Sequence, residues 1–232
     1  MLIASDKRLN NIFHEPVILY DGKVLNRVSQ TKILGLKLDE HLRWNEHVDG
    51  LIIEIFQALK MIRRISSFMS QNNLLIIYHS LIEQRLHYCS IVWDTLSDGL
   101  KQKLQKLQNR AARIITKSSY DYPSEELFVQ FRWHELQRQR NSKKVIIMFK
   151  VLNNLALEYR TDLFCRTNQV HDYSLRNSDQ NLVLQKPKTN SLRPSFSYSG
   201  AVLWNSLPRN VRFAQSLSGF KRSLMQSYVI NH

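Results

Sequence analysis

The spacing of apolar residues in the first part of the chain is typical of short β-strands. Val17–Tyr20 and Lys23–Val28 are apolar-rich runs separated by the two residues Asp21 and Gly22. Aspartate and glycine both tolerate a positive φ, which a two-residue hairpin turn requires. This segment therefore predicts a β-hairpin.

Two further segments before residue 45 also have the pattern of strands. Met1–Ala4 is a short apolar run. In Ile33–Leu38, leucines alternate with a mixed set of residues, which predicts a strand with one buried face. Gly35 lies inside this expected strand and indicates a bulge or a close approach of another backbone.

From about His47 the period becomes helical, because apolar residues recur at steps of three and four. The pattern predicts an amphipathic helix over residues 47–65. A second helix is expected over residues 72–88, with Ser70 as its N-cap, and a third over residues 100–116. Further helices are expected from Pro123-Ser124, over Trp133–Asn153 and over Leu217–Tyr228.

The periodicity weakens after Leu157. Strand-like and loop-like pieces alternate there, through Ser174–Leu184, Pro187–Pro194 and Ser195–Pro208. Two roles are open for Trp204, stacking on a base or packing in a core. The expected fold class is mainly α: an N-terminal β-hairpin or short sheet, then a helical bundle, then a mixed C-terminal segment.

The expected helix over residues 100–116 carries an apolar stripe and a separate basic stripe. The basic stripe lies roughly 110° from the apolar one, within an arc of about 80°, when each residue advances about 100°. It consists of Lys103, Lys106, Arg110, Arg113 and Lys117. A solvated charged face is the commoner explanation, but such faces usually mix signs because pairs of opposite charge stabilise a helix. Five like charges favour a polyanionic ligand and predict contacts with nucleic-acid phosphates.

The charge of the whole chain is concentrated in two stretches. The 232 residues include 33 Lys and Arg against 19 Asp and Glu, a net charge of +14. Six basic residues and no acid lie between Gly99 and Tyr120, and seven basic residues follow Asp179, the last acid. A local excess of this kind indicates a binding surface for nucleic acid, with an anionic membrane as the alternative.

Composition narrows the class of protein further. Apolar residues make up 43% of the chain, which favours a folded globular protein. The chain contains no run of 18 consecutive apolar residues, the length needed to span a bilayer, so no membrane partner is expected. Cys89 and Cys165 form neither a disulfide framework nor a CxxC zinc motif. We expect both to be small buried residues of an intracellular protein in a reducing compartment.

The chain lacks the common catalytic signatures. It contains no GxSxG, HExxH or GxxxxGK[ST] motif, and no adjacent aspartates that could hold two metal ions. His87 and Cys89 are two residues apart with no second pair of ligands, so they are expected to be packing positions. The residues therefore predict no catalytic group, no metal site and no resident cofactor, which argues against an enzyme.

Several strings of residues resemble one family of proteins. Thr31–Asp39, with Leu42, Trp44 and His47, follows the pattern T-K-[FI]-L-G-x-x-x-D-x-x-L-x-W-x-x-H. The strings LQKLQNRAAR (residues 104–113) and SFSYSGAVLWNSLP (residues 195–208) are long enough to be highly specific. With shorter strings between and after them, they resemble reverse transcriptases of non-long-terminal-repeat retrotransposons over nearly the whole chain.

This resemblance implies three parts. Residues 1–45 would be a palm remnant with a primer-grip-like hairpin, and residues 46–157 a helical thumb-like domain. Residues 158–232 would be a C-terminal segment of unknown role. Met1–Ala4 would be the last palm strand, and Thr31–Asp39 would be the primer grip, which positions the primer end. The match adds Lys32 and Gly35 to the expected nucleic-acid-binding residues. The thumb in this family holds the template–primer duplex.

The polymerases of this family carry metal-binding aspartates in an [FY]-x-D-D turn that this chain lacks. The expected function is that of a truncated reverse transcriptase piece, which binds RNA, DNA or an RNA–DNA hybrid through the backbone and does not polymerise. Mg²⁺ is expected only in an intact polymerase, and the compartment is the nucleus or the cytoplasm. Two alternatives stay open, a stand-alone basic RNA- or DNA-binding protein derived from the element and a non-functional relic. The sequence does not indicate an oligomeric state.

Overall fold

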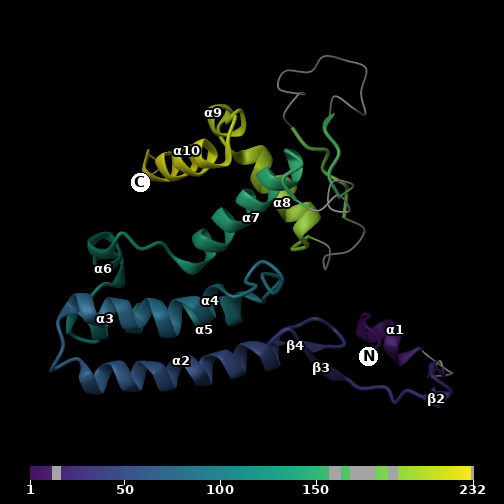
Figure 1. Ribbon diagram of the computed structural model, residues 1–232, viewed down its shortest axis with the longest axis horizontal. Helices are drawn as coiled ribbons and strands as arrows, with labels where there is room; N and C mark the ends of the chain where they lie inside the picture. The colour runs from purple at the N-terminus through teal and green to yellow at the C-terminus, as the bar shows by residue number, and fades with distance from the viewer. Residues whose placement is uncertain (12–16, 157–162, 168–180, 188–192, 231–232) are drawn as a thin grey trace. The chain divides into compact units, whose positions relative to one another are not determined.

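The computed structural model describes residues 1–11, 17–156, 163–167, 181–187 and 193–230 (Figure 1). Contacts within the chain define two compact units. The first comprises Met1–Tyr88 with Leu96–Trp133, and the second Cys89–Thr95 with His134–His232. The described part is mainly helical with two small antiparallel hairpins near the N-terminus, which confirms the expected fold class. The division at residues 45 and 157 stays a prediction.

The first unit begins with a short helix, α1 (Asp6–Asn10), and the hairpin of β1 (Leu19–Tyr20) and β2 (Lys23–Val24). Asp21 and Gly22 form its turn with φ values of 49° and 71°, which confirms the predicted hairpin. The expected strand at Met1–Ala4 is wrong. This segment has no regular secondary structure, and Ala4 N–H donates one hydrogen bond to the carbonyl of Glu40, the residue after β4.

A second hairpin, β3 (Gln30–Ile33) with β4 (Leu36–Asp39), replaces the single strand expected at Ile33–Leu38. Leu34 and Gly35 form the turn with φ values of 48° and 84°, so Gly35 serves a turn and not a bulge. The alternation of leucines with other residues continues through this turn, so the sequence pattern did not indicate that the chain reverses direction there. The Leu36 side chain is buried, whereas Leu34 at the tip is 83% exposed.

The helices of the first unit follow the expected periods. They are α2 (Asn45–Ile65), α3 (Gln71–Tyr78), the π-helical turn η1 (His79–Glu83), α4 (Gln84–His87), α5 (Asp98–Thr116) and α6 (Ser124–Phe131). Ser70 caps α3 by accepting a hydrogen bond from Asn73 N–H, as predicted. Helix α2 packs along α5, and Figure 1 shows it running beneath α3, α4 and α5. Apolar side chains such as Ile55, Leu59 and Leu104 are buried between these helices.

The second unit is built on α7 (Leu136–Leu152), α8 (Phe196–Ser206), α9 (Arg209–Arg212) and α10 (Leu217–Ile230). The strand or loop expected at Ser195–Pro208 is wrong, because α8 occupies most of it and packs on α7. Trp204 is buried and stacks on Phe220 with ring centroids 5.9 Å apart, so its role is core packing. Most of Ser174–Leu184 and part of Pro187–Pro194 lie outside the described residues.

The strings that resemble the family also have structural explanations in this unit. The Asn205 amide pairs with the Leu182 backbone, accepting from its N–H and donating to its carbonyl at 2.9 Å each. A Cβ added at Gly200 would lie 2.7 Å from the buried Met148 sulfur, so a larger residue there would force the Met148 side chain to move. Asn205 and Gly200, both in the second long string, therefore have packing roles in this unit.

Candidate nucleic-acid interface

Helix α5 presents the predicted basic stripe on its surface. The Lys103, Lys106 and Lys117 side chains are exposed, and those of Arg110 and Arg113 are half-buried. Lys117 is the C-cap of the helix, in the left-handed conformation with a φ of 57°. Because a helix rises about 1.5 Å per residue, the stripe extends over about 21 Å. Its members are therefore spread along the helix.

The C-terminal half of this stripe forms a surface hollow with the end of α2. The hollow has a volume of about 260 Å³ and is lined by Arg63, Ser66, Arg110, Arg113, Ile114, Lys117, Ser118 and Tyr120. Four of these residues are cations and none is an acid. Three of the four belong to the predicted stripe. The described residues that line this hollow carry guanidinium and ammonium groups, and these groups suit phosphate oxygens.

Contacts within the protein hold the two stripe arginines in position. The Arg110 guanidinium lies 4.9 Å from the centre of the Phe56 ring of α2, and Lys60 lies at the same distance from that ring. Arg113 Nε donates a 2.8 Å hydrogen bond to the Tyr122 carbonyl oxygen, and its guanidinium lies 5.9 Å from the Tyr120 ring. This bond occupies one of the five N–H donors of the side chain, so the guanidinium is oriented and still has donors for a ligand.

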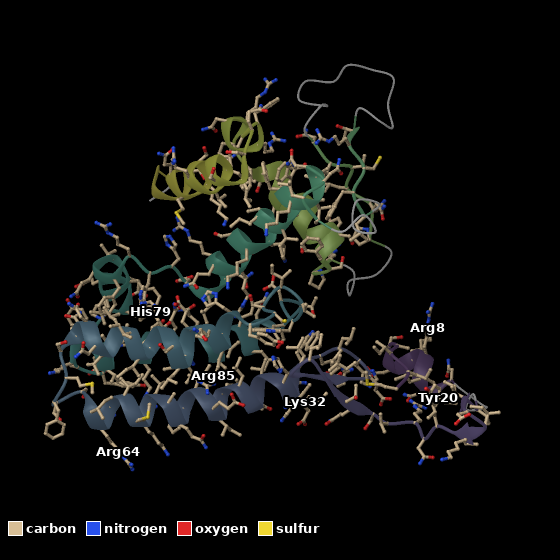
Figure 2. The ribbon with its side chains drawn as sticks, in the orientation of Figure 1. Arg8, Tyr20, Lys32, Arg64, His79 and Arg85 are labelled. Atoms are coloured by element: carbon tan, nitrogen blue, oxygen red, sulfur yellow. The ribbon has the colours of Figure 1, made fainter. Side chains whose placement is uncertain are left out.

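Sequence reasoning missed the contribution of α2 to this surface. Arg63 lines the hollow and Lys60 lies beside Phe56. A signal was present, because no acid occurs between Glu54 and Glu83 while three basic residues do: Lys60, Arg63 and Arg64. Figure 2 shows Arg64 on the outer side of α2. We call Arg63 and the five stripe residues together the α2–α5 basic surface.

Lys32 and Gly35 lie at a different hollow of the first unit. This hollow measures about 450 Å³ and its lining includes Lys32, Gly35, Lys37, His47, Glu54 and Arg85. Arg85 extends from α4 and donates to the Glu54 carboxylate at 3.1 Å, so this site contains an ion pair (Figure 2). Burial and the charge of Lys37 lower the pKa of His47, against an opposing effect of Glu54.

The two hollows lie at opposite ends of α2. The hollow at Lys32 and Gly35 is lined by residues within 47–54 of this helix, and the basic hollow by Arg63 and Ser66 at its C-terminal end. The structure therefore brings Arg110, Arg113 and Lys117 together with Arg63, and places Lys32 and Gly35 elsewhere. Whether these residues bind nucleic acid stays a prediction.

The other residues of the T-K-[FI]-L-G string have structural roles. The Asp39 carboxylate accepts hydrogen bonds from the backbone N–H groups of His41, Arg43 and Trp44 at 2.9–3.1 Å. Trp44 is 2% exposed and has a positive φ of 67° at the N-terminus of α2. Asp39 thus fixes the turn that places Trp44 in the core.

We expect Asp39→Asn to destabilise the chain at pH 7 by about 1 kcal/mol, because backbone N–H groups bond more weakly to a neutral amide oxygen than to a carboxylate. Partial burial raises the pKa of Asp39, but the N–H donors of Arg43, Trp44 and His41 outweigh it and the net pKa lies below 3.8. A lowered folded-state pKa stabilises the fold above pH 4, and this contribution is lost as the pH falls from 3.8 through the lowered pKa. Urea unfolding at pH 7 and at pH 2.5 checks this, because the difference between the two proteins should be smaller at pH 2.5 than at pH 7. An equal difference at both values would contradict the assignment.

The two cysteines lie outside the α2–α5 basic surface in the sequence. Cys89 is exposed, so its expected burial is wrong; it has a φ of 47° in the turn that follows α4. Cys165 is half-buried. Within the described ranges, no three His, Cys, Asp or Glu side chains lie close enough together to hold a metal ion. None of the described helices is both long and apolar enough to cross a membrane.

Comparisons with known proteins point to one class of polymerase. No family model and no solved structure matches the chain. Among curated proteins, the chain is similar to a "Probable RNA-directed DNA polymerase from transposon BS" of Drosophila melanogaster, with 25% identity over 122 residues. The matched region covers 51% of this chain and 14% of the fly protein. This similarity indicates that part of the chain is related to a reverse transcriptase.

Proposed function

We propose that the chain is a fragment of a retrotransposon reverse transcriptase that binds nucleic acid through the phosphate backbone, at the α2–α5 basic surface. The hollow lined by four cations and no acid carries this proposal. Its positive charges are unneutralised by lining carboxylates, and its half-buried arginines are already oriented by Phe56 and Tyr122. Such contacts position a nucleic acid without reading its bases.

The similarity to the fly protein supports the class of ligand. That protein is named as an RNA-directed DNA polymerase, and this chain spans 14% of its length. Under the proposal, helices α2–α6 act as a thumb-like support for the duplex, and the β3–β4 hairpin acts as a primer-grip-like element. RNA, DNA and their hybrids would all be ligands, because each presents a phosphate backbone.

We propose further that the chain does not polymerise by itself. Nucleotidyl transfer by two metal ions needs carboxylates that hold both ions. Among the described residues, no three His, Cys, Asp or Glu side chains lie close enough together to hold a metal ion. Under the proposal, Mg²⁺ is held by the carboxylates of an intact polymerase. Primer extension on an RNA template with the purified chain should give no product, and template-dependent extension would overturn this statement.

The proposal is tested by the salt dependence of binding to a labelled RNA–DNA hybrid. Six contacts to phosphate, from the five stripe residues and Arg63, give a slope of about −5.4 in a plot of log K against log salt. Affinity should then fall roughly 2,000-fold between 50 and 200 mM salt. Absence of binding at 50 mM by a folded chain would contradict the proposal and favour the non-functional relic. A shallow slope with tight binding would favour a binder that uses a different surface.

A further inference from the structure

One of the side chains that line the basic hollow is aromatic. Tyr120 lines the hollow and is 82% exposed. Most of the Tyr120 side-chain surface therefore lies open to solvent beside four cations. Aromatic rings beside basic groups are the combination by which proteins bind single-stranded nucleic acid, because the ring stacks on a base while the cations hold the phosphates.

The geometry around Tyr120 leaves its ring available on one side. The Arg113 guanidinium lies 5.9 Å from the ring centre, a cation–π contact that occupies one face. Arg113 is itself fixed by its hydrogen bond to the Tyr122 carbonyl oxygen. The exposed ring is therefore held against a fixed guanidinium, and its other face is open to solvent. Phe68, which follows the lining residue Ser66 by two positions, is 89% exposed and adds a second aromatic ring in the α2–α3 turn.

We propose that this hollow binds an unpaired nucleotide, with a base stacked on Tyr120 and the adjacent phosphate held by Arg63, Arg113 and Lys117. The inference rests on the proposed function, since it assigns a ligand to one part of the same surface. It distinguishes two kinds of contact along α5. The lysines on the N-terminal half of the helix hold a backbone of any form, and the hollow selects single strands or duplex ends with an overhang. Bases inside a duplex are already stacked on each other and cannot stack on Tyr120.

The test compares two probes of one sequence, a single-stranded 12-mer with a central 2-aminopurine and the same strand in a blunt duplex. With the full chain, the single strand should bind and its 2-aminopurine fluorescence should be quenched by stacking. Tyr120→Leu should weaken single-strand binding between about fivefold and about 150-fold and remove the quenching. Duplex affinity should change less than twofold. Tyr120→Phe keeps the ring and should retain both properties.

Tyr20→Leu is the matched control, because Tyr20 is also strongly exposed in the first unit and lies on β1, away from the hollow in the sequence (Figure 2). It should leave the affinity for both probes unchanged. An equal effect of Tyr120→Leu on both probes, or no effect on either, would overturn the inference while the proposed function stands. Failure of the wild-type chain to bind either probe would overturn both. A loss of affinity in Tyr120→Phe would show that the hydroxyl group, and not stacking, makes the contact.

Discussion

Replacing Arg63, Lys106 and Lys117 with glutamine should halve the salt dependence of nucleic-acid binding. Each phosphate contact contributes about −0.9 to the slope for a duplex, so a change from six contacts to three takes the slope from about −5.4 to about −2.7. Between 50 and 200 mM salt, the affinity of the variant should then fall roughly 40-fold, against roughly 2,000-fold for the unmodified chain. A filter-binding or anisotropy titration with an RNA–DNA hybrid at four salt concentrations measures both slopes.

These three positions are preferred to the two stripe arginines for a structural reason. Arg63, Lys106 and Lys117 are exposed, whereas Arg110 stacks on Phe56 and Arg113 bonds to the Tyr122 carbonyl oxygen. Glutamine is a good helix former at positions 63 and 106, and at the left-handed position 117 it replaces another residue with an unbranched side chain, so the exposed replacements should leave the fold intact.

A variant with Lys7, Arg8 and Lys23 replaced by glutamine is the matched control. These side chains are exposed in α1 and β2, and their removal lowers the net charge by the same amount. The control should keep the slope of the unmodified chain. Equal slopes in both variants would mean that net charge, and not the α2–α5 basic surface, determines binding.

The sequence predicted best those elements whose apolar residues repeat along one face of a single helix. The period of three and four along α2 and α5 placed both helices within a few residues of their observed ends. The hairpin at Asp21-Gly22 was found for a local reason as well, since its turn residues accept positive φ. By contrast, α8 has a weak helical pattern and depends on Gly200 allowing close packing against Met148 on α7. That contact joins residues far apart in the sequence, so no local pattern could reveal it.

Some residues of the candidate site could likewise be predicted from a local pattern, and others depend on contacts between distant segments. The basic stripe of α5 follows from angles around a single helix, so it could be predicted. The addition of Arg63 needed the pairing of α2 with α5, and the position of Tyr120 needed the turn that follows α5. The separation of Lys32 from the stripe likewise depends on which end of α2 each hollow occupies. The family resemblance added Lys32 and Gly35 to the stripe residues, and only the fold shows that the two groups line separate hollows.

A buried charge cluster in the second unit was not signalled by the sequence. Lys144 of α7 donates to the Asp94 carboxylate at 2.7 Å and to the Ser199 hydroxyl oxygen at 3.0 Å. Arg140, one turn earlier on α7, lies 3.9 Å from the same carboxylate and 5.1 Å from the centre of the Trp93 ring. All three charged side chains are at most 5% exposed. Burial lowers the pKa of Arg140, and the nearby Asp94 charge opposes this effect.

We expect Asp94→Asn to be among the most destabilising single changes in the chain. It leaves two buried cations without a carboxylate, and removing one partner of a buried ion pair costs about 3–5 kcal/mol. Urea unfolding followed by circular dichroism measures the loss as a lower midpoint at an unchanged slope. A loss below about 1 kcal/mol would mean that water reaches these charges.

A double-mutant cycle separates the pair from a general effect of mutating the core. Lys144→Met alone should also destabilise, because it leaves Asp94 with only the more distant Arg140. Asp94→Asn combined with Lys144→Met removes one buried charge of each sign, so it should cost less than the sum of the two single changes, by about 0.5–3 kcal/mol. Strict additivity would show that Asp94 and Lys144 do not interact. A positive coupling would establish that this ion pair joins the segment Cys89–Thr95 to α7 within the second unit, and the energetic reason would be burial, since an exposed pair of the same geometry contributes at most about 1 kcal/mol.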